Sequence, residues 1–309
     1  MAGAFCRVLG VWFLEVNVMS FSARCYLRSL ADSAPIIGVL LATLALGGCS
    51  AVHLGYANSP SLVYWWMDRY ADFSSEQGTQ LRADLQIVHD WHRSMEIPRL
   101  VQQLRDLQAM APKDVTPDQV CRVVDAVQER VQVTLERMVP AVARVAPTVQ
   151  SAQLSHFSKA LEARERKWQE EWLQPPLPER NQHRAKQWLQ RLESFYGDLD
   201  KAQVALIHAH IPQSSVNPEL QLREIQRRHQ DILQTFKRVR DKAMQKEDTR
   251  GELQALLARS LHSPDATYRR YAAQVRQESC QLMSELHKLS SPAQRQHLIN
   301  TLKSYEIDN

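Results

Sequence analysis

Apolar residues recur at every third or fourth position through most of the chain after residue 60. From Val120 to Val145 they place a continuous stripe along one side of a helix. Stripes of the same spacing predict core helices over 222–243, 268–289 and 81–95. Shorter amphipathic segments predict helices over 62–70, 154–173, 184–196, 203–210 and 294–302. No segment shows a convincing strand pattern, so the sequence predicts an all-α protein.

Short segments rich in proline and serine separate these helices. They are APKDVTP, QPPLPE, IPQSSVNP, KEDTRG, HSPD and SSPA. Such residues end one helix and start the next, and short connections favour antiparallel neighbours. We therefore expect an elongated bundle of antiparallel helices over residues 61–309, with a candidate hinge at 174–180. Pro98 lies inside a helical pattern that runs from Gln77 to Met110, and it should kink or split that helix because proline removes a backbone hydrogen bond.

Four helix starts share one motif, in which Ser, Thr or Asp is followed three residues later by Gln. They are Ser74–Gln77, Thr116–Gln119, Asp200–Gln203 and Ser291–Gln294. In such a capping box the first side chain accepts from the amide of the Gln, and the Gln side chain accepts from the amide of the first residue. Helix capping explains the motif without a function. The motif also resembles the Leu-Thr-x-x-Gln signature of periplasmic stress proteins, and this resemblance implies a chaperone that holds unfolded clients.

The first 48 residues have a different pattern. Arg24 and Arg28 precede an apolar run from Ile36 to Leu46, which is followed by the sequence GGCS. A basic start, an apolar core and small residues at the cut are the parts of a secretory signal peptide. The run is too short for a membrane-spanning helix, which needs about 20 apolar residues. We therefore expect residues 1–48 to be a signal peptide.

Cys49, directly after the two glycines, resembles the cysteine of the bacterial lipobox. The resemblance implies cleavage before Cys49, attachment of a diacylglyceryl group to its sulfur, and acylation of the new amino terminus. Met19 would start a signal of ordinary length, and residues 49–60 would form a tether. Ser50 stands where aspartate would resemble an inner-membrane retention signal, so we expect an outer-membrane lipoprotein that faces the periplasm.

Composition agrees with the helical pattern. Removal of 48 residues from 309 leaves 261, of which 35 are basic and 32 acidic. This balance gives no basic domain for nucleic acid, and we exclude that partner. Only four glycines follow Cys49, whereas sheets and phosphate loops use more. Leu, Ala, Gln, Arg and Glu dominate instead, and these residues lose little side-chain freedom in a helix.

Aromatic residues concentrate in the segment YWWMDRY, which starts at Tyr64, and in the segment WHR at 91–93. The candidate binding cluster is Trp65, Trp66, Asp68, Arg69, Trp91 and His92. One interpretation is that the rings form the heaviest core layer, because buried aromatic residues dominate packing. A second is contact with the membrane interface, which Trp and Tyr favour. A third is a polar pocket of Asp68, Arg69 and His92 beneath an aromatic rim.

The order of these motifs resembles that of a family of bacterial lipoproteins of unknown function. The matching elements are the lipobox, YWW-D-R-Y, FSSEQ, WHR, EIPR and TPDQ, and the similarity is best between Leu62 and Gln119. It implies a helical protein anchored in the cell envelope and brings no assigned activity. Within the matching motifs it draws attention to Trp66, Asp68, Arg69, Trp91 and Pro98.

Two cysteines remain in the mature chain. Cys121 and Cys280 each lie beside the apolar stripe of a predicted core helix. An oxidising compartment favours a disulfide between them, and two buried free thiols are the alternative. His89 and His92 have i,i+3 spacing, but no cysteine or acidic partner stands at a recognised zinc spacing. We therefore expect no metal and no cofactor.

The sequence also lacks a nucleophile elbow, a glycine-rich phosphate loop and a convincing Ser-x-x-Lys motif. We expect a non-enzymatic envelope lipoprotein that is held to the membrane by its N-terminal lipid and acts as a binding or scaffold protein for a protein partner. The alternative is a chaperone-like protein of the envelope stress response. A hydrolase that acts through Asp68 and His92 is the third hypothesis.

Overall fold

The computed structural model describes residues 48–242 and 245–307. The predicted signal peptide therefore lies outside the described residues, apart from Gly48. Within the described ranges the regular elements are helices and none is a strand, which confirms the all-α class. The predicted tether is itself helical, because α3 spans Gly48–Ala57 and α4 begins at Ser59.

The helices follow one another through short connections. The first half contains α3 (Gly48–Ala57), α4 (Ser59–Ala71), α5 (Ser75–Trp91), the π-helix η1 (His92–Glu96), α6 (Ile97–Met110), α7 (Pro117–Val145), the 3-10 turn η2 (Ala146–Thr148) and α8 (Ser151–Trp172). The second half contains α9 (Leu177–Tyr196), α10 (Lys201–Gln213), α11 (Pro218–Asp241), α12 (Lys246–Leu261), α13 (Ala266–Lys288) and α14 (Pro292–Ser304). Each helix that periodicity predicts is present.

Helix α12 was missed by the sequence pattern. The segment KEDTRG was expected to be a break, but α12 begins at its first residue, Lys246. The buried residues Leu253 and Leu256 are too few to form a long stripe, and the polar Thr249 is buried beside them. A helix without one sustained apolar face gives no clear 3.6-residue period.

The helix around Pro98 is split, as the sequence predicts. Between α5 and α6 lies the single π-helical turn η1, in which the amide of Ile97 donates to the carbonyl of His92. Five-residue spacing of this kind is typical of a π-turn. Pro98, which has no N–H to donate, is the second residue of α6 and directly follows this turn.

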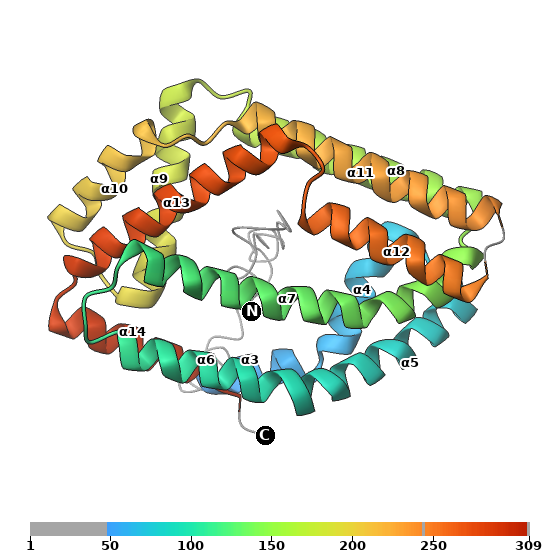
Figure 1. The fold of residues 1–309 in the computed structure, drawn as a ribbon, viewed down its shortest axis with the longest axis horizontal. Helices are drawn as coiled ribbons and strands as arrows, with labels where there is room; N and C mark the ends of the chain where they lie inside the picture. The colour runs from blue at the N-terminus through green and yellow to red at the C-terminus, as the bar shows by residue number, and fades with distance from the viewer. Residues whose placement is uncertain (1–47, 243–244, 308–309) are drawn as a thin grey trace, which may run out of the picture.

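The helices lie around the middle of the molecule rather than in one straight bundle (Figure 1). Helix α7 packs against α5 on one side and against α12 and α13 on the other. Contacts continue from α5 through α4, α8, α11 and α12, and we name this group the α4–α5 end. Contacts from α13 continue through α10, α9 and α14 to α6, and we name this group the α9–α10 end.

Each end has its own hydrophobic core. The core of the α9–α10 end consists of Ala185, Leu192, Tyr196, Ile207, Ile211 and Leu286. The α4–α5 end has two clusters, one of Leu81, Leu85, Ala141, Val145 and Val149, the other of Val139, Ala143, Ala146, Val239, Leu253 and Leu256. The chain passes from one end to the other between α8 and α9, so the candidate hinge at 174–180 begins at this boundary. Motion at that point remains a prediction.

All four predicted capping boxes are present. In addition, two pairs of glutamines at helix starts bond to each other. Nε2 of Gln153 donates to Oε1 of Gln77 at 2.7 Å, and Gln77 donates back at 3.4 Å. Gln203 and Gln294 exchange the same two bonds at 3.1 and 2.8 Å. The N-termini of α5 and α8 are thereby joined at one end of the molecule, and those of α10 and α14 at the other.

Candidate functional site

Helix α4 is the element that positions most of the candidate cluster. It ends at Asp72, whose φ of 49° is left-handed and whose amide donates to the carbonyl of Asp68. The Asp68 carboxylate accepts from the amide of Phe73 at 3.0 Å. Asp68 therefore shapes the turn that leads from α4 to the capping box of α5, which is a structural role.

The inner face of α4 packs closely on α5. Tyr64 of α4 lies over Gly78 of α5. A Cβ placed on Gly78 would be only 2.6 Å from the Tyr64 hydroxyl oxygen. The guanidinium of Arg82 lies 3.8 Å from the centre of the Tyr64 ring. Burial, with a smaller contribution from the Asp68 carboxylate, raises the pKa of the Tyr64 hydroxyl. The absence of a side chain at Gly78 thus allows the two helices to approach.

The outer face of α4 carries the exposed aromatic residues. Trp65 is 50% exposed, Trp66 37% and Leu62 42%. The guanidinium of Arg69 lies 5.1 Å from the centre of the Trp65 ring, and the ring of Trp66 lies 5.3 Å from that of Tyr70. The interpretation of these tryptophans as a core layer is therefore wrong, because the core uses the opposite side of α4. We name Leu62, Trp65, Trp66 and Arg69 the outer strip.

The two remaining candidates lie on α5 and η1 and make other contacts. The ring of Trp91 lies 6.2 Å from that of His92 and 5.5 Å from the guanidinium of Arg137. Nδ1 of His92 is 3.0 Å from the hydroxyl of Tyr56. Among the described contacts none joins Asp68 to His92, so the structure does not assemble the polar pocket that a hydrolase would require.

Residues of α3 and the start of α4 complete this histidine contact, and the sequence pattern did not identify them. Besides its bond to His92, Tyr56 stacks against His89 with 4.8 Å between ring centres, and the hydroxyl of Ser59 is 3.0 Å from Nδ1 of His89. Burial lowers the pKa of His92 and raises the pKa of Tyr56 to about 12. The i,i+3 spacing of His89 and His92 was the available signal for this contact. The two histidines hold α3 and α4 against α5.

Three deeply buried carboxylates are neutralised by arginine. Asp84 accepts from Arg144 on α7. Glu96 accepts from Arg99 at 2.8 Å and from Arg130 at 3.4 Å. Glu224 accepts from Arg227, Arg228 and Ser263. Paired in this way, these acids contribute to helix packing, because a buried charge is tolerated when it is paired and hydrogen-bonded.

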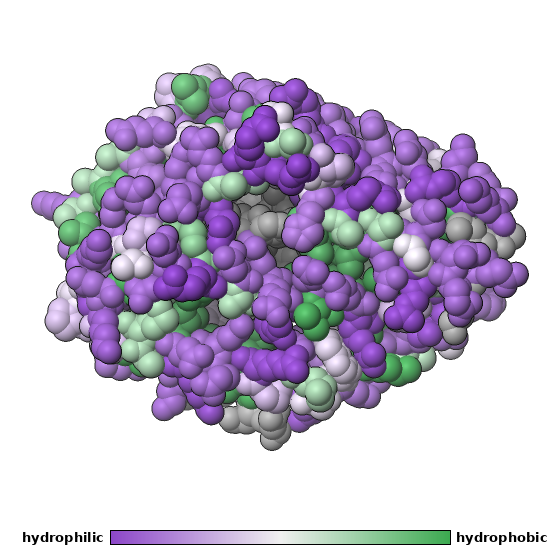
Figure 2. Space-filling view, viewed as in Figure 1, coloured by the Kyte–Doolittle hydropathy of each residue, from purple (hydrophilic) through white to green (hydrophobic). Residues whose placement is uncertain are grey.

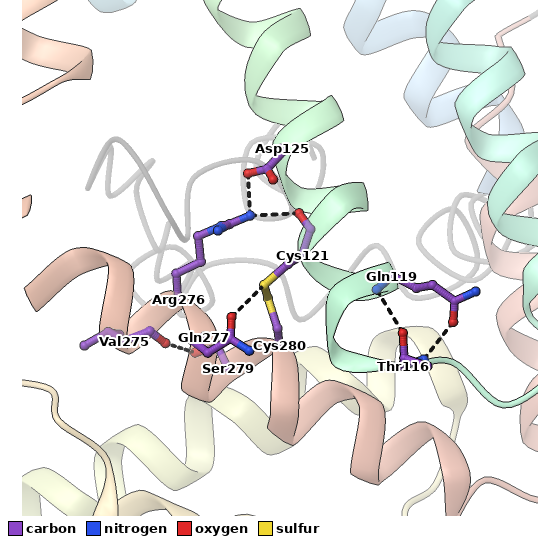
Figure 3. Close-up of a disulfide and its surroundings, with 9 residues drawn as sticks. All are labelled: Thr116, Gln119, Cys121, Asp125, Val275, Arg276, Gln277, Ser279 and Cys280. Atoms are coloured by element: carbon purple, nitrogen blue, oxygen red, sulfur yellow. Dashed lines mark hydrogen bonds and ion pairs between the residues drawn. A yellow bond between two sulfur atoms is a disulfide. The ribbon is translucent and has the colours of Figure 1, made fainter. Parts of the chain in front are cut away.

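A disulfide joins Cys121 on α7 to Cys280 on α13, with the two Cα atoms 5.5 Å apart (Figure 3). Arg276, one turn before Cys280, donates to the carbonyl of Cys121 at 3.1 Å and pairs with Asp125. Further along α13, the hydroxyl of Ser284 donates to the carbonyl of Val115 at 2.6 Å. The first turns of α7 are thus fixed to α13 on both sides of the sulfur atoms.

The described residues hold no group of three or more His, Cys, Asp or Glu side chains that could bind a metal ion. No helix within the same ranges is long and apolar enough to cross a bilayer. The face shown in Figure 2 is mainly hydrophilic, with small and separate apolar groups. Helix α4 passes behind α7 in that view (Figure 1).

These features define an all-α protein in which the disulfide and the buried charges serve the packing of helices. The chain belongs to the Family of unknown function (DUF6279), which it matches over residues 69–289. The match continues far past Gln119, where the expected similarity ended, but it begins at Arg69 and so does not include residues 62–68. No curated protein and no solved structure matches the chain.

Proposed function

We propose that this protein is a lipoprotein of the bacterial cell envelope, attached through Cys49 to the outer membrane, and that its helical domain is a non-enzymatic binding or scaffold module in the periplasm. The observation that carries the proposal is the outer strip, which exposes two tryptophans and a leucine on α4, the helix that follows α3 and its candidate lipid site. Monomeric soluble proteins rarely leave contiguous large apolar side chains uncovered unless they bind something.

The disulfide and the paired helix starts support the same proposal. They hold α5, α7 and α13 in fixed positions and therefore give the outer strip a rigid support. A rigid support lowers the entropy that is lost on binding. The deeply buried carboxylates that could otherwise indicate acid–base chemistry are occupied by arginine.

The chaperone hypothesis depends on the similarity of the capping boxes to the Leu-Thr-x-x-Gln signature. Each box glutamine accepts from a helix-start amide, and Gln77, Gln203 and Gln294 also take part in the glutamine pairs. Helix capping therefore accounts for the motif. Suppression of aggregation of an unfolded client by the purified protein would favour the chaperone over the scaffold.

The test of the anchor uses the full chain expressed in a bacterium. Mass spectrometry of the N-terminal peptide should find Cys49 as the first residue, carrying a diacylglyceryl group and an acylated amine. The Cys49→Ser variant should appear in the soluble periplasmic fraction or remain uncut. An unmodified residue 49 in an uncut wild-type chain would overturn the proposal.

A further inference from the structure

We propose that the outer strip of α4 lies in the headgroup region of the same membrane to which Cys49 is attached. The folded domain would then be docked on the lipid surface by α4 and would not hang freely from its lipid. This inference rests on the proposed lipid anchor, adds a second, non-covalent contact with the bilayer, and names the bilayer as what the outer strip binds.

The spacing of the strip provides the first argument. Leu62, Trp65, Trp66 and Arg69 stand at positions i, i+3, i+4 and i+7, so their side chains share one face of the helix. All four are exposed. The opposite face of α4 is occupied by Val63, Tyr64 and Met67, which pack against the core of the α4–α5 end. Helix α4 therefore has an apolar face on each side, and the core covers only one of them.

The position of the strip identifies the lipid surface as the occupant. Residues 48–57 form α3, which packs on α4. At about 1.5 Å per helical residue, Cys49 and Trp65 are at most about 25 Å apart along the two helices. This distance is smaller than the hydrocarbon thickness of a bilayer, which is about 30 Å. Acyl chains on Cys49 would therefore keep the strip within reach of the membrane surface at all times.

The chemistry of the strip also fits a lipid surface. Tryptophan favours the boundary between headgroups and acyl chains, because its ring is apolar and its N–H is polar. Arg69 is the one charged residue among the exposed residues of α4, and the acidic Asp68 beside it is bonded to the amide of Phe73. A cationic group beside an indole ring is suited to anionic phospholipid headgroups. On α3, Leu54 is 63% exposed and adds apolar surface.

The experiment uses the full-length lipidated protein reconstituted into vesicles of phosphatidylethanolamine and phosphatidylglycerol, with bromine atoms near the headgroup end of the acyl chains. Bromine quenches nearby indole fluorescence. The wild type should show a quenched fraction that falls at least twofold in Trp65→Phe/Trp66→Phe. The matched control Trp172→Phe, which changes a tryptophan at the end of α8, should not lower the quenched fraction. Since Trp65 and Trp66 are exposed, their replacement should leave the thermal midpoint unchanged.

The possible outcomes separate the two proposals. If the protein stays on the vesicles after a salt wash but the double variant is quenched like the wild type, the docking inference is overturned while the anchor stands. If the wild-type protein washes off, the anchor itself fails. In intact cells, a photoreactive residue at position 66 should attach to phospholipid. Its attachment to one defined protein would overturn the docking inference in favour of a protein partner.

Discussion

The α4–α5 end and the α9–α10 end are each closed by a pair of glutamines, but the two pairs differ in burial. At the α9–α10 end, Asp200 and Ser291 both accept from the amide of their box glutamine, and Gln203 is fully buried. At the α4–α5 end, Ser74 does the same, and the side chain of Gln150 donates to the carbonyl of Thr148 just before α8. Gln77 and Gln153 are both nearly buried, at 8% and 9% exposed, whereas at the α9–α10 end the exposure is confined to Gln294, which is half-buried.

The glutamine pair therefore has a different role at each end. At the α9–α10 end it belongs to a closed core, which also buries Tyr196 and His287. At the α4–α5 end it joins α5 and α8, the two helices on which α4 packs, and α4 carries the exposed aromatic surface. We therefore expect changes at the α9–α10 end to affect mainly stability, and changes to the outer strip to affect mainly binding.

The largest effect is expected from loss of the disulfide, which fixes α7 to α13 beside the α9–α10 end. Removal of a native disulfide lowers the unfolding free energy by about 2–5 kcal/mol, and the loss is larger when the disulfide closes a longer loop. Urea unfolding with and without a reductant measures this loss. Hydrogen exchange should show that α10 and α14 lose more protection than α8. The variant Cys121→Ser/Cys280→Ser should not respond to the reductant, and equal stability of the oxidised and reduced wild type would contradict the prediction.

The next effect concerns the glutamine pairs. Gln203→Ala should lower the unfolding free energy by about 2–3 kcal/mol, because the amide of Asp200 and the side chain of Gln294 lose buried partners. Gln153→Ala should cost less, about 1–2 kcal/mol, since water can reach part of its site. Double-mutant cycles within each pair should give coupling of about 1 kcal/mol or more. Equal losses at the two ends would show that the pairs do not differ in strength.

A smaller effect is expected where α4 approaches α5. Gly78→Ala should destabilise the protein by about 1 kcal/mol, because the new methyl group would meet the Tyr64 hydroxyl. Tyr64→Phe removes that oxygen and should reverse the loss. Gly251→Ala is the matched control, since nothing lies within 4 Å of its added Cβ; it should stabilise α12 by about 0.5–1 kcal/mol. Thermal unfolding of Gly78→Ala, Tyr64→Phe, the double variant Gly78→Ala/Tyr64→Phe and Gly251→Ala tests the contact.

The smallest effect is a dependence of stability on pH. His287 donates from Nε2 to the carbonyl of Lys113 and lies 2.8 Å from the Tyr196 hydroxyl through Nδ1. Burial, together with the charge of Arg295, outweighs Asp114 and the backbone carbonyls and lowers the pKa of His287 below its ordinary 6.5. Below pH 6.5 the unfolded chain therefore binds a proton more readily than the folded chain does, and stability falls until the pH reaches the folded-state pKa.

His287→Gln should weaken this pH dependence, because a glutamine can donate to Lys113 and accept from Tyr196 without titrating. Denaturant midpoints measured between pH 5 and pH 7.5 compare the variant with the wild type. Some dependence should remain, since burial also lowers the pKa of His92, His210 and His229. An unchanged pH profile in the variant would show that His287 does not contribute.

The helices and their caps could be predicted from the sequence because both are local. The stripe of α7 and the box at Thr116 each depend on residues within a few turns of each other. The pairing of the boxes could not be predicted, since Gln77 and Gln153 are 76 residues apart and nothing local indicates which helix starts meet. Helix α12 was missed because its buried positions form no continuous stripe.

The candidate site was identified as a segment but not as a surface. The rule that large aromatic residues are buried predicted a core position for Trp65 and Trp66. On α4 the core side is taken by Tyr64 and Met67, and the tryptophans are left outside. Which face of an amphipathic helix is covered depends on its neighbours, and here both faces are apolar. Gly78 is one of only four glycines after Cys49, and its place near the start of α5 was the available signal for a close neighbour.

The bond between Cys121 and Cys280 also encloses most of the chain. Their separation of 159 residues places α8, α9, α10, α11 and α12 inside one covalent ring. A protease that cuts once between α8 and α9 would open this ring without releasing a fragment. The cut protein would migrate as a single species under oxidising conditions and as two pieces after reduction, so a protease would need two cuts to remove any helix from the ring.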